Sequence, residues 1–371
     1  MPRSNPGAQD GLAAGLDGRT GGLDGRTGGL DGRTGDRGFR TGGPIPKVVA
    51  FGGGHGLAAS LAALRRLTPH ITAVVTVADD GGSSGRIRRE FGAVPPGDLR
   101  MALAALAGPE PRHQRWAQLL QHRFGGTGAL AGHPVGNLVI TGLMEQLGDP
   151  VAALDSAGQM VGAVGRVLPM STLPLEIAAD VVGTDAGDPA RVRRIRGQVA
   201  VATTPGRVVA VELVPAAPPA CPEAVAAIRA ADVVVLGPGS WFTSVIPHLL
   251  VPDLLAAIVQ TSAMRIVALN LAPQAGETAG FSPAQHLDVL AAHAPELRLD
   301  AIIADVAAVE DTRDLDRAAT RLAARLVLAP VAAGDGIPRH DPELLAAAFA
   351  QVIGGNLTPA TSGTGGSNRA G

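Results

Sequence analysis

The sequence lacks several residue types on which common enzyme mechanisms depend. It contains no tyrosine, and Lys47 is its sole lysine. A Schiff-base lysine, a phosphate-loop lysine behind a glycine turn and the Tyr-x-x-x-Lys pair of many dehydrogenases therefore have no candidates. Cys221 is the only cysteine, which excludes an internal disulfide and favours a reducing compartment.

Long apolar runs are also absent. Glycine, proline or charged residues interrupt every apolar stretch well before it reaches the length of a bilayer span, and the N-terminus has no apolar signal-peptide core. We therefore expect a cytoplasmic protein without a membrane span. The formal net charge of −2 gives no general attraction to polyanions, so we expect no nucleic-acid partner.

The chain has 371 residues, of which 46% are hydrophobic, so it can form a large core, but its two ends differ from the rest. Residues 1–43 are rich in glycine and repeat the sequence GLDGRTG three times. One leucine in each repeat cannot form a buried face, so we predict a disordered tail there and a second one over 354–371. The folded domain is then expected over 44–353.

Inside these limits, short β-branched runs alternate with stretches rich in alanine and leucine, which indicates βαβ units. We predict a single domain with a Rossmann-like α/β fold and a doubly wound, mostly parallel sheet. The predicted strands are 47–51, 71–78, 232–237, 265–272, 300–305 and 325–331; the clearest helices are 57–67, 99–107, 138–147, 252–263, 283–293 and 341–352. Residues 163–214 contain closely spaced strands and no helical pattern, so we predict an antiparallel insertion there.

The first predicted strand leads into a glycine-rich turn and a helix. In a doubly wound sheet, the exposed amides of such a turn and the start of the following helix form an anion site. The turn is neither the dinucleotide motif, because Leu57 holds the last glycine position, nor a phosphate loop, because no lysine follows. Alternatively, the glycines serve only a tight turn and close packing of the helix. The glycines concerned are Gly52, Gly53, Gly54 and Gly56.

The second predicted strand ends in two aspartates and a Gly/Ser turn. Asp79 or Asp80 could accept a sugar hydroxyl or hold Mg²⁺, and Ser83 and Ser84 could form a nest of hydroxyls and amides. The alternative is an Asx-turn, followed by a solvated face that carries Arg86, Arg88 and Arg89.

Further polar residues stand near predicted helix starts. Asp98 is expected to cap a helix, and Arg100 in the first turn of that helix suggests a ligand or an acidic partner. Asn137 is expected to cap a later helix, and His133 before it to serve packing or the surface.

A third glycine turn follows the strand at 232–237. Ser240, Thr243 and Ser244 could contact a phosphate there, although the turn is not the G-x-S-x-G elbow of hydrolases. Cys221 is expected to be an inert residue near a helix cap. The sequence thus shows neither a nucleophile–base pair nor a metal cluster, and it indicates binding of a phosphorylated, nucleotide-like ligand.

Six separated motifs, in this order and spacing, resemble the YvcK-type gluconeogenesis factors, which belong to the superfamily of 2-phospho-L-lactate transferase. The resemblance covers about 47–353 and rests on VVAFGGGHGLAASLAALR, VTVADDGGSSGRIRREFG, PPGDLR, GHPVGNLVITGL, LGPGSWFTSVIPHLLVP and NLAPQAGETAGFSPAQHLDVL.

This resemblance implies a protein that binds UDP-glucose or UDP-N-acetylglucosamine, needs no cofactor, and serves cell shape, wall-precursor supply and growth on gluconeogenic carbon sources. It implies regulatory protein partners in wall-precursor synthesis and a Ser/Thr kinase, and it leaves a homodimer open. Ligand contacts are expected from the glycine turn with His55, from Asp80, Ser83, Ser84, Asp98, Arg100 and Asn137, and from Gly237, Gly239, Ser240, Thr243, Asn270, Phe281, Arg317 and Arg321.

Two positions depart from the family pattern. His55 stands where threonine is common, and Phe281 replaces a tyrosine, which removes one neutral hydrogen bond of about 1 kcal/mol. A transferase that uses Mg²⁺ on Asp79 or Asp80 is the main alternative to a binding regulator. A nicotinamide-dependent oxidoreductase rests only on the sheet and glycine pattern.

Overall fold

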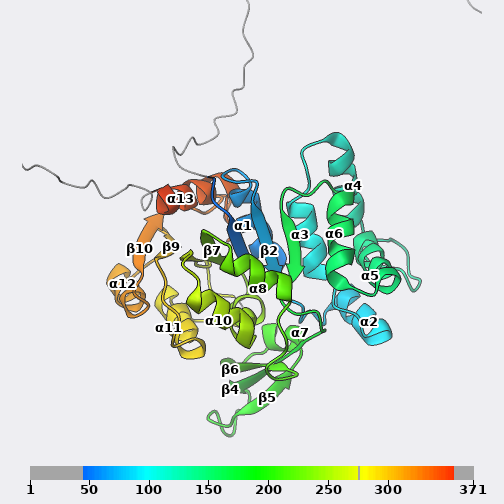
Figure 1. The fold of residues 1–371 in the computed structure, drawn as a ribbon. Helices are drawn as coiled ribbons and strands as arrows, with labels where there is room; N and C mark the ends of the chain where they lie inside the picture. Colours follow the sequence, from blue (N-terminus) through cyan, green and yellow to red (C-terminus); the bar gives the residue numbers. More distant parts are fainter. Residues whose placement is uncertain (1–44, 275, 355–371) are drawn as a thin grey trace, which may run out of the picture. The chain divides into compact units, whose positions relative to one another are not determined.

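The computed structural model describes residues 45–274 and 276–354 (Figure 1). The predictions of disordered tails fall outside these residues, except that Gly354 is the last residue of helix α13, Pro342–Gly354. Among the described residues, no single helix has the length and apolar composition to cross a membrane. Two consecutive helical segments of this part of the chain, Trp241–Leu249 and Pro252–Gln260, are long and apolar enough when taken together. The chain bends by 74° between them.

The main sheet has seven strands in the order β10-β9-β8-β7-β1-β2-β3, and all its pairs are parallel. The strands are β1 Val48–Gly52, β2 Ile71–Val75, β3 Arg166–Pro169, β7 Val233–Leu236, β8 Met264–Ala268, β9 Ala301–Asp305 and β10 Arg325–Ala329. The strand order reverses direction between β1 and β7, where Val48 lies opposite Val233. The predicted Rossmann-like fold is confirmed, and this reversal is the place where such sheets bind ligands.

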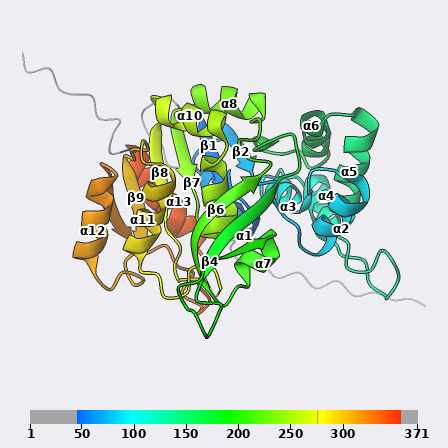
Figure 2. The same cartoon turned by 90° about the horizontal axis from the view of Figure 1, so that it is seen from below.

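Helices cover both faces of this sheet, so its central strands are apolar along their whole length. Every residue of β1 is buried, as is every residue of β7. Figures 1 and 2 show α1 and α13 on one face and α8 and α10 on the other. Proline at the first helical turn marks where several helices begin, because it has no amide hydrogen to leave unpaired there. The bounds are α1 Gly54–Leu64, α8 Pro222–Arg229, α10 Pro252–Gln260, α11 Pro283–His293 and α12 Thr312–Arg321.

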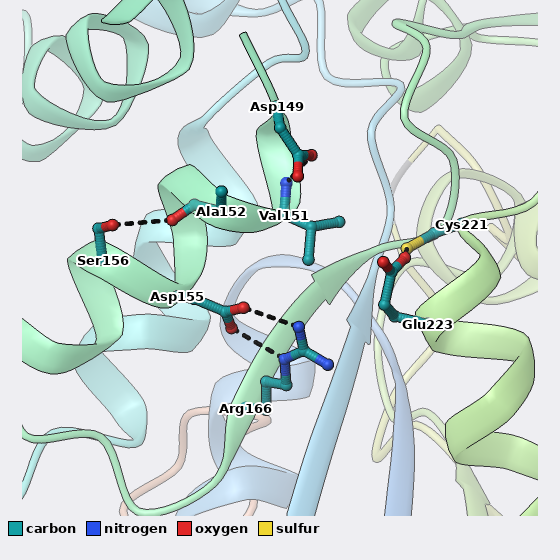
Figure 3. A network of polar contacts seen from close by, with 8 residues as sticks. All are labelled: Asp149, Val151, Ala152, Asp155, Ser156, Arg166, Cys221 and Glu223. Atoms are coloured by element: carbon teal, nitrogen blue, oxygen red, sulfur yellow. Dashed lines mark hydrogen bonds and ion pairs between the residues drawn. The ribbon is translucent and has the colours of Figure 1, made fainter. Parts of the chain in front are cut away.

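Five helices gather beyond the β2–β3 edge of the sheet (Figure 1). They are α2 Gly82–Phe91, α3 Gly97–Ala105, α4 Pro111–Gln121, α5 Val135–Leu147 and α6 Pro150–Met160. Helix α6 is tied to β3 by Asp155, whose carboxylate accepts two hydrogen bonds from Arg166, at 2.8 and 2.7 Å (Figure 3). This helical group places α2, α3 and α5 next to the end of β2.

The antiparallel insertion is present, but it is smaller than predicted. Its sheet has the order β5-β4-β6, with β4 Glu176–Val182, β5 Arg193–Arg196 and β6 Arg207–Val214. Strand β3, which the prediction placed in the insertion, pairs in parallel with β2 as the edge of the main sheet.

The prediction of no helix over 163–214 was also wrong, because Gln198–Ala202 forms the short helix α7. Gly197 turns the chain with φ +95°, and the carboxylate of Asp80 accepts a hydrogen bond from the amide of Val199 at 3.0 Å. The apolar run 198–202 is short enough to form either a strand or a helical turn. The backbone angle at Gly197 and the hydrogen bond to Asp80 favour the helical turn.

Candidate functional site

The turns after β1 and β7 are packed against each other at the point where the strand order reverses. A Cβ atom added at Gly56 would lie 2.6 Å from the Cα atom of Gly239, and closer still to the carbonyl oxygen of Pro238. Only glycine allows this approach. Gly54 and Gly237 have φ of +54° and +73°, values that favour glycine in both turns.

Asn270, just after β8, holds the second of these turns. Its Oδ1 atom accepts a hydrogen bond from the amide of Gly239 at 2.9 Å, and its Nδ2 atom donates to the carbonyl of Gly239 at 2.8 Å. One side chain therefore fixes both peptide groups of Gly239. We call Gly52–Gly56, Gly237–Ser240 and Asn270 the switch-point cluster.

A buried carboxyl group borders the switch-point cluster. Glu277 is 2% exposed, and it accepts a hydrogen bond from the hydroxyl of Ser240, which is also bonded to Thr243. Burial raises the pKa of Glu277, while the hydroxyls of Ser240 and Thr243 offset part of this effect. Ser240 is the N-cap residue of the π-helix η1, Trp241–Val245, in which Thr243 and Ser244 are buried. Sequence reasoning missed Glu277, although it lies inside the GETAGF motif.

A cavity of about 370 Å³ opens next to Asn270, at the ends of β8 and β9. Its apolar wall includes Leu271 and Phe281, and Phe281 is held edge-to-face against Phe242 and His286, with ring centroids 6.2 and 5.6 Å apart. Its rim is acidic and consists of Glu310, Asp311 and Asp314. A cavity of this kind suits a ring and hydroxyl groups better than it suits a phosphate.

At the end of β2, the two aspartates are held by backbone amides. Oδ1 of Asp79 accepts a hydrogen bond from Gly81 at 2.9 Å, which is the Asx-turn considered as the alternative. Asp80 holds α7 of the insertion through Val199, and its carboxylate lies against Gly197. Among the described residues, no three His, Cys, Asp or Glu side chains come together as ligands for a metal ion.

The predicted nest after Asp80 is instead the start of helix α2. Ser83 and Ser84 are buried, and the hydroxyl of Ser84 accepts a hydrogen bond from the amide of Gly97 at 3.1 Å. Arg86 does not lie on a solvated face as the alternative proposed, because it donates to the carbonyls of Ala129 and Ala131 at 3.2 and 3.0 Å. Arg89 is exposed and Arg88 is half-buried.

Four buried side chains form a hydrogen-bonded relay between α3, α5 and α2. Nε of Arg100 donates to Oδ1 of Asn137 at 2.9 Å, and Nδ2 of Asn137 donates to the hydroxyl of Ser83 at 2.9 Å. That hydroxyl lies 2.7 Å from Nδ1 of His133, whose pKa is lowered by burial and then by the charge of Arg86. A neutral His133 can accept the proton of Ser83, so the structure pairs a hydroxyl with a base that the sequence did not reveal.

Two predicted helix caps are absent from the structure. Asn137 is inside α5, whose N-cap is Pro134, and its side chain is committed to the relay. The N-cap of α3 is Pro96, and no side chain caps it. Asp98, in the first turn of α3, points its carboxyl group at Gly53 and Gly54 instead.

Asp98 and Arg100 both carry shifted pKa values. Burial raises the pKa of Asp98 to about 7, and the charge of Asp79 adds to this effect, while the Gly54 amide and Arg100 oppose it. Burial lowers the pKa of Arg100 to about 10, with a further contribution from Arg123, and Arg100 is only 4% exposed. Both groups are ionisable side chains held beside the first glycine turn.

Four residues singled out in the sequence remain to be placed. Arg317 and Arg321 are exposed on α12, where Arg317 lies 3.6 Å from Asp314 and Arg321 pairs with Asp288, and neither lines the cavity. His55 is exposed at the start of α1. Cys221 is the N-cap residue of α8; its thiol donates to Glu223 at 3.2 Å, and burial raises its pKa to about 12 (Figure 3).

Comparison with known proteins extends this description. The family model of "2-phospho-L-lactate transferase CofD" matches residues 48–328. A Mycobacterium tuberculosis H37Rv protein named "Putative gluconeogenesis factor" is 61% identical over 303 residues, which cover 81% of this chain and 88% of that protein. The "Gluconeogenesis factor" of Bacillus subtilis 168 is 37% identical over 251 residues, covering 68% and 76% of the two chains.

A solved structure has the same fold. The crystal structure of a member of the UPF0052 family from Bacillus halodurans superimposes with a TM-score of 0.73 and 31% sequence identity. The match covers 83% of this chain and 99% of that chain, so the sheet and the helices around the switch-point cluster are shared over nearly the whole relative.

Proposed function

This chain belongs to the CofD family, within its group of gluconeogenesis factors, and from that premise we propose that it binds a UDP-sugar at the switch-point cluster. One observation carries the proposal. Two glycine turns are packed together, Asn270 holds the second of them through Gly239, and Asn270 also lines a cavity with an aromatic wall and an acidic rim.

The two parts of this site suit the two parts of a nucleotide sugar. Amides of the first glycine turn and the start of α1 bind the diphosphate, because backbone donors can approach it there without side-chain obstruction. The uracil or sugar ring packs on Phe281, and ring hydroxyls donate to the carboxylates of Glu310, Asp311 and Asp314. The acidic rim keeps the phosphates at the glycine turns, since like charges repel.

We propose that binding serves regulation in the cytoplasm rather than turnover. Bound UDP-sugar stabilises a conformation that a partner protein in wall-precursor supply recognises, which couples this supply to growth on gluconeogenic carbon sources. The carboxylates at the end of β2 support a binding role, because Asp79 and Asp80 are each engaged by a backbone amide.

Calorimetric titration of the full chain with UDP-N-acetylglucosamine tests the binding step. We expect saturable binding that weakens about tenfold in Phe281→Ala, since stacking on one aromatic ring contributes about 1 kcal/mol beyond area burial. Phe91→Ala is the matched control, because Phe91 ends α2, is 51% exposed and does not line the cavity. Absence of binding at millimolar ligand, or equal weakening in both variants, would contradict the proposal.

A transferase is the second candidate, and one observation favours it. Asp98 stands against the glycine turn with its pKa raised to about 7, which suits a general acid or base near neutral pH. Incubation with a guanylylated phospholactate donor and a deazaflavin acceptor, followed by mass analysis, separates the two functions. Repeated turnover that Asp98→Asn abolishes would establish the transferase, and absence of product would favour the regulator.

A further inference from the structure

A second hollow lies beside the first glycine turn, between α1, α3 and the end of α4. Its volume is about 510 Å³. His55 and Ala58 of α1 line it together with Arg100, Met101, Ala104 and Ala105 of α3, and Gln121 and Arg123 complete the wall. The polar part of this lining consists of two arginines, a histidine and a glutamine, and it contains no carboxylate.

The two arginines of this hollow have no carboxylate in direct contact, although the charges of Asp98 and Asp79 offset part of the lowered pKa of Arg100. Arg100 is 4% exposed, yet neither it nor Arg123 forms an ion pair with any of the described residues. Arg123 donates to the carbonyl of Gly132 at 2.9 Å, which holds it in place without neutralising its charge. Burial lowers the pKa of Arg100, and the nearby charge of Arg123 adds to this effect. A nearly buried cation costs free energy unless something compensates its charge.

The hydrogen-bonded relay holds Arg100 in a fixed orientation toward the hollow. Its Nε atom is bonded to Asn137, which is bonded in turn to Ser83 and, through Ser83, to His133. Among the described residues, the two terminal nitrogens of Arg100 have no hydrogen-bond partner. A guanidinium whose inner nitrogen is anchored and whose outer nitrogens are free can form a bidentate pair with a phosphate.

We infer that this hollow is a second anion site, which binds an organic phosphate monoester. The phosphate group pairs with Arg100 and Arg123, with His55 and Gln121 as further donors. The hollow is larger than a phosphate ion requires, and Ala58, Met101, Ala104 and Ala105 offer an apolar wall to the rest of the ligand. This site is distinct from the proposed UDP-sugar site, because its two arginines lie outside the switch-point cluster and the cavity beside it, and the hollow shares only His55 with that cluster.

Titration of the full-length protein with inorganic phosphate and with phenyl phosphate tests the inference, with binding followed by ³¹P NMR. Arg123→Gln is the informative variant, because Arg123 is exposed and its replacement leaves the buried relay intact. Arg115→Gln is the matched control, since Arg115 is an exposed arginine of α4 that does not line the hollow. Each titration is repeated with the protein saturated by UDP-N-acetylglucosamine.

We expect both probes to bind saturably, with phenyl phosphate binding more tightly because its ring meets the apolar wall. Arg123→Gln should weaken both about tenfold, Arg115→Gln should leave them unchanged, and UDP-N-acetylglucosamine should not displace them. Absence of saturable binding, or equal effects of the two substitutions, would overturn the inference. Displacement by the nucleotide sugar would also overturn it, because the hollow would then be part of the first site. Failure of UDP-N-acetylglucosamine to bind would instead count against the proposed function alone.

Discussion

Replacing Asp98 by asparagine should stabilise the protein in a pH-dependent way. The carboxyl group lies against Gly53 and Gly54, and burial raises its pKa from 3.8 to about 7. Between these pH values the native state holds a proton that the unfolded chain has released. The contribution of Asp98 to stability therefore falls as the pH rises from 3.8 to 7, and it stays low above pH 7.

The size of this effect follows from the shift. At 1.36 kcal/mol per pKa unit, a rise of about three units corresponds to at most about 4 kcal/mol at pH 8. Asp98 retains partial contact with solvent, so we expect about half of this amount. Asp98→Asn should gain little stability at pH 4 and about 2 kcal/mol at pH 8, because an amide cannot ionise.

Urea unfolding at a series of pH values, followed by tryptophan fluorescence, measures this difference. Trp241 is fully buried and reports the loss of the core. Asp316→Asn, an exposed substitution on α12, is the control and should stay within about 0.5 kcal/mol of the parent at every pH. A stability difference between Asp98→Asn and the parent that does not change with pH, or that favours the parent at pH 8, would refute the reasoning.

Two further predictions concern residues around the switch-point cluster. Burial lowers the pKa of His248 from 6.5 to about 4, and nearby backbone groups offset only part of this effect. The unfolded chain therefore binds more protons in this interval, and the parent should lose up to about 3 kcal/mol as the pH falls from 6.5 to 4. His248→Phe should remove this loss, as measured by urea unfolding across the same pH range; an unchanged pH slope would contradict the assignment. Gly56→Ala should separate the two turns, cost about 1–3 kcal/mol and abolish calorimetric binding of UDP-N-acetylglucosamine. Gly142→Ala in α5 is its control, because an added Cβ atom meets nothing there within 4 Å; normal binding by Gly56→Ala would show that the close approach of the turns is not needed.

The sequence was most informative about the main sheet. Buried parallel strands need continuous β-branched runs, and such runs are visible in "KVVAF" and "DVVVLG" without any tertiary information. Strand β3 was not predicted as part of the main sheet, because it has only four residues and stands beside the insertion. Its pairing with β2 could not be deduced from the local sequence pattern. Residues 198–202 were misjudged because Gly197 and the distant Asp80 decide their conformation.

Only those parts of the candidate site that depend on neighbouring residues in the sequence could be predicted. The glycine turns follow strands directly, so their position at one edge of the sheet is a consequence of the fold class. The relay could not be predicted, because Ser83 and Asn137 are 54 residues apart and meet only through the packing of α2, α3 and α5. Asp98 and Asn137 are residue types that often cap helices, but here their side chains bond to residues that are distant in the sequence. Phe281 lines the cavity, whereas the ligand roles of Arg317 and Arg321 stay predictions.

A crystal structure of the protein grown with UDP-N-acetylglucosamine tests the central claim most directly. We predict density for the diphosphate against the exposed side of the paired turns at Gly52–Gly56 and Gly237–Ser240, with one ring against Phe281. Density for the ligand elsewhere on the molecule, with this pair of turns empty, would contradict the account.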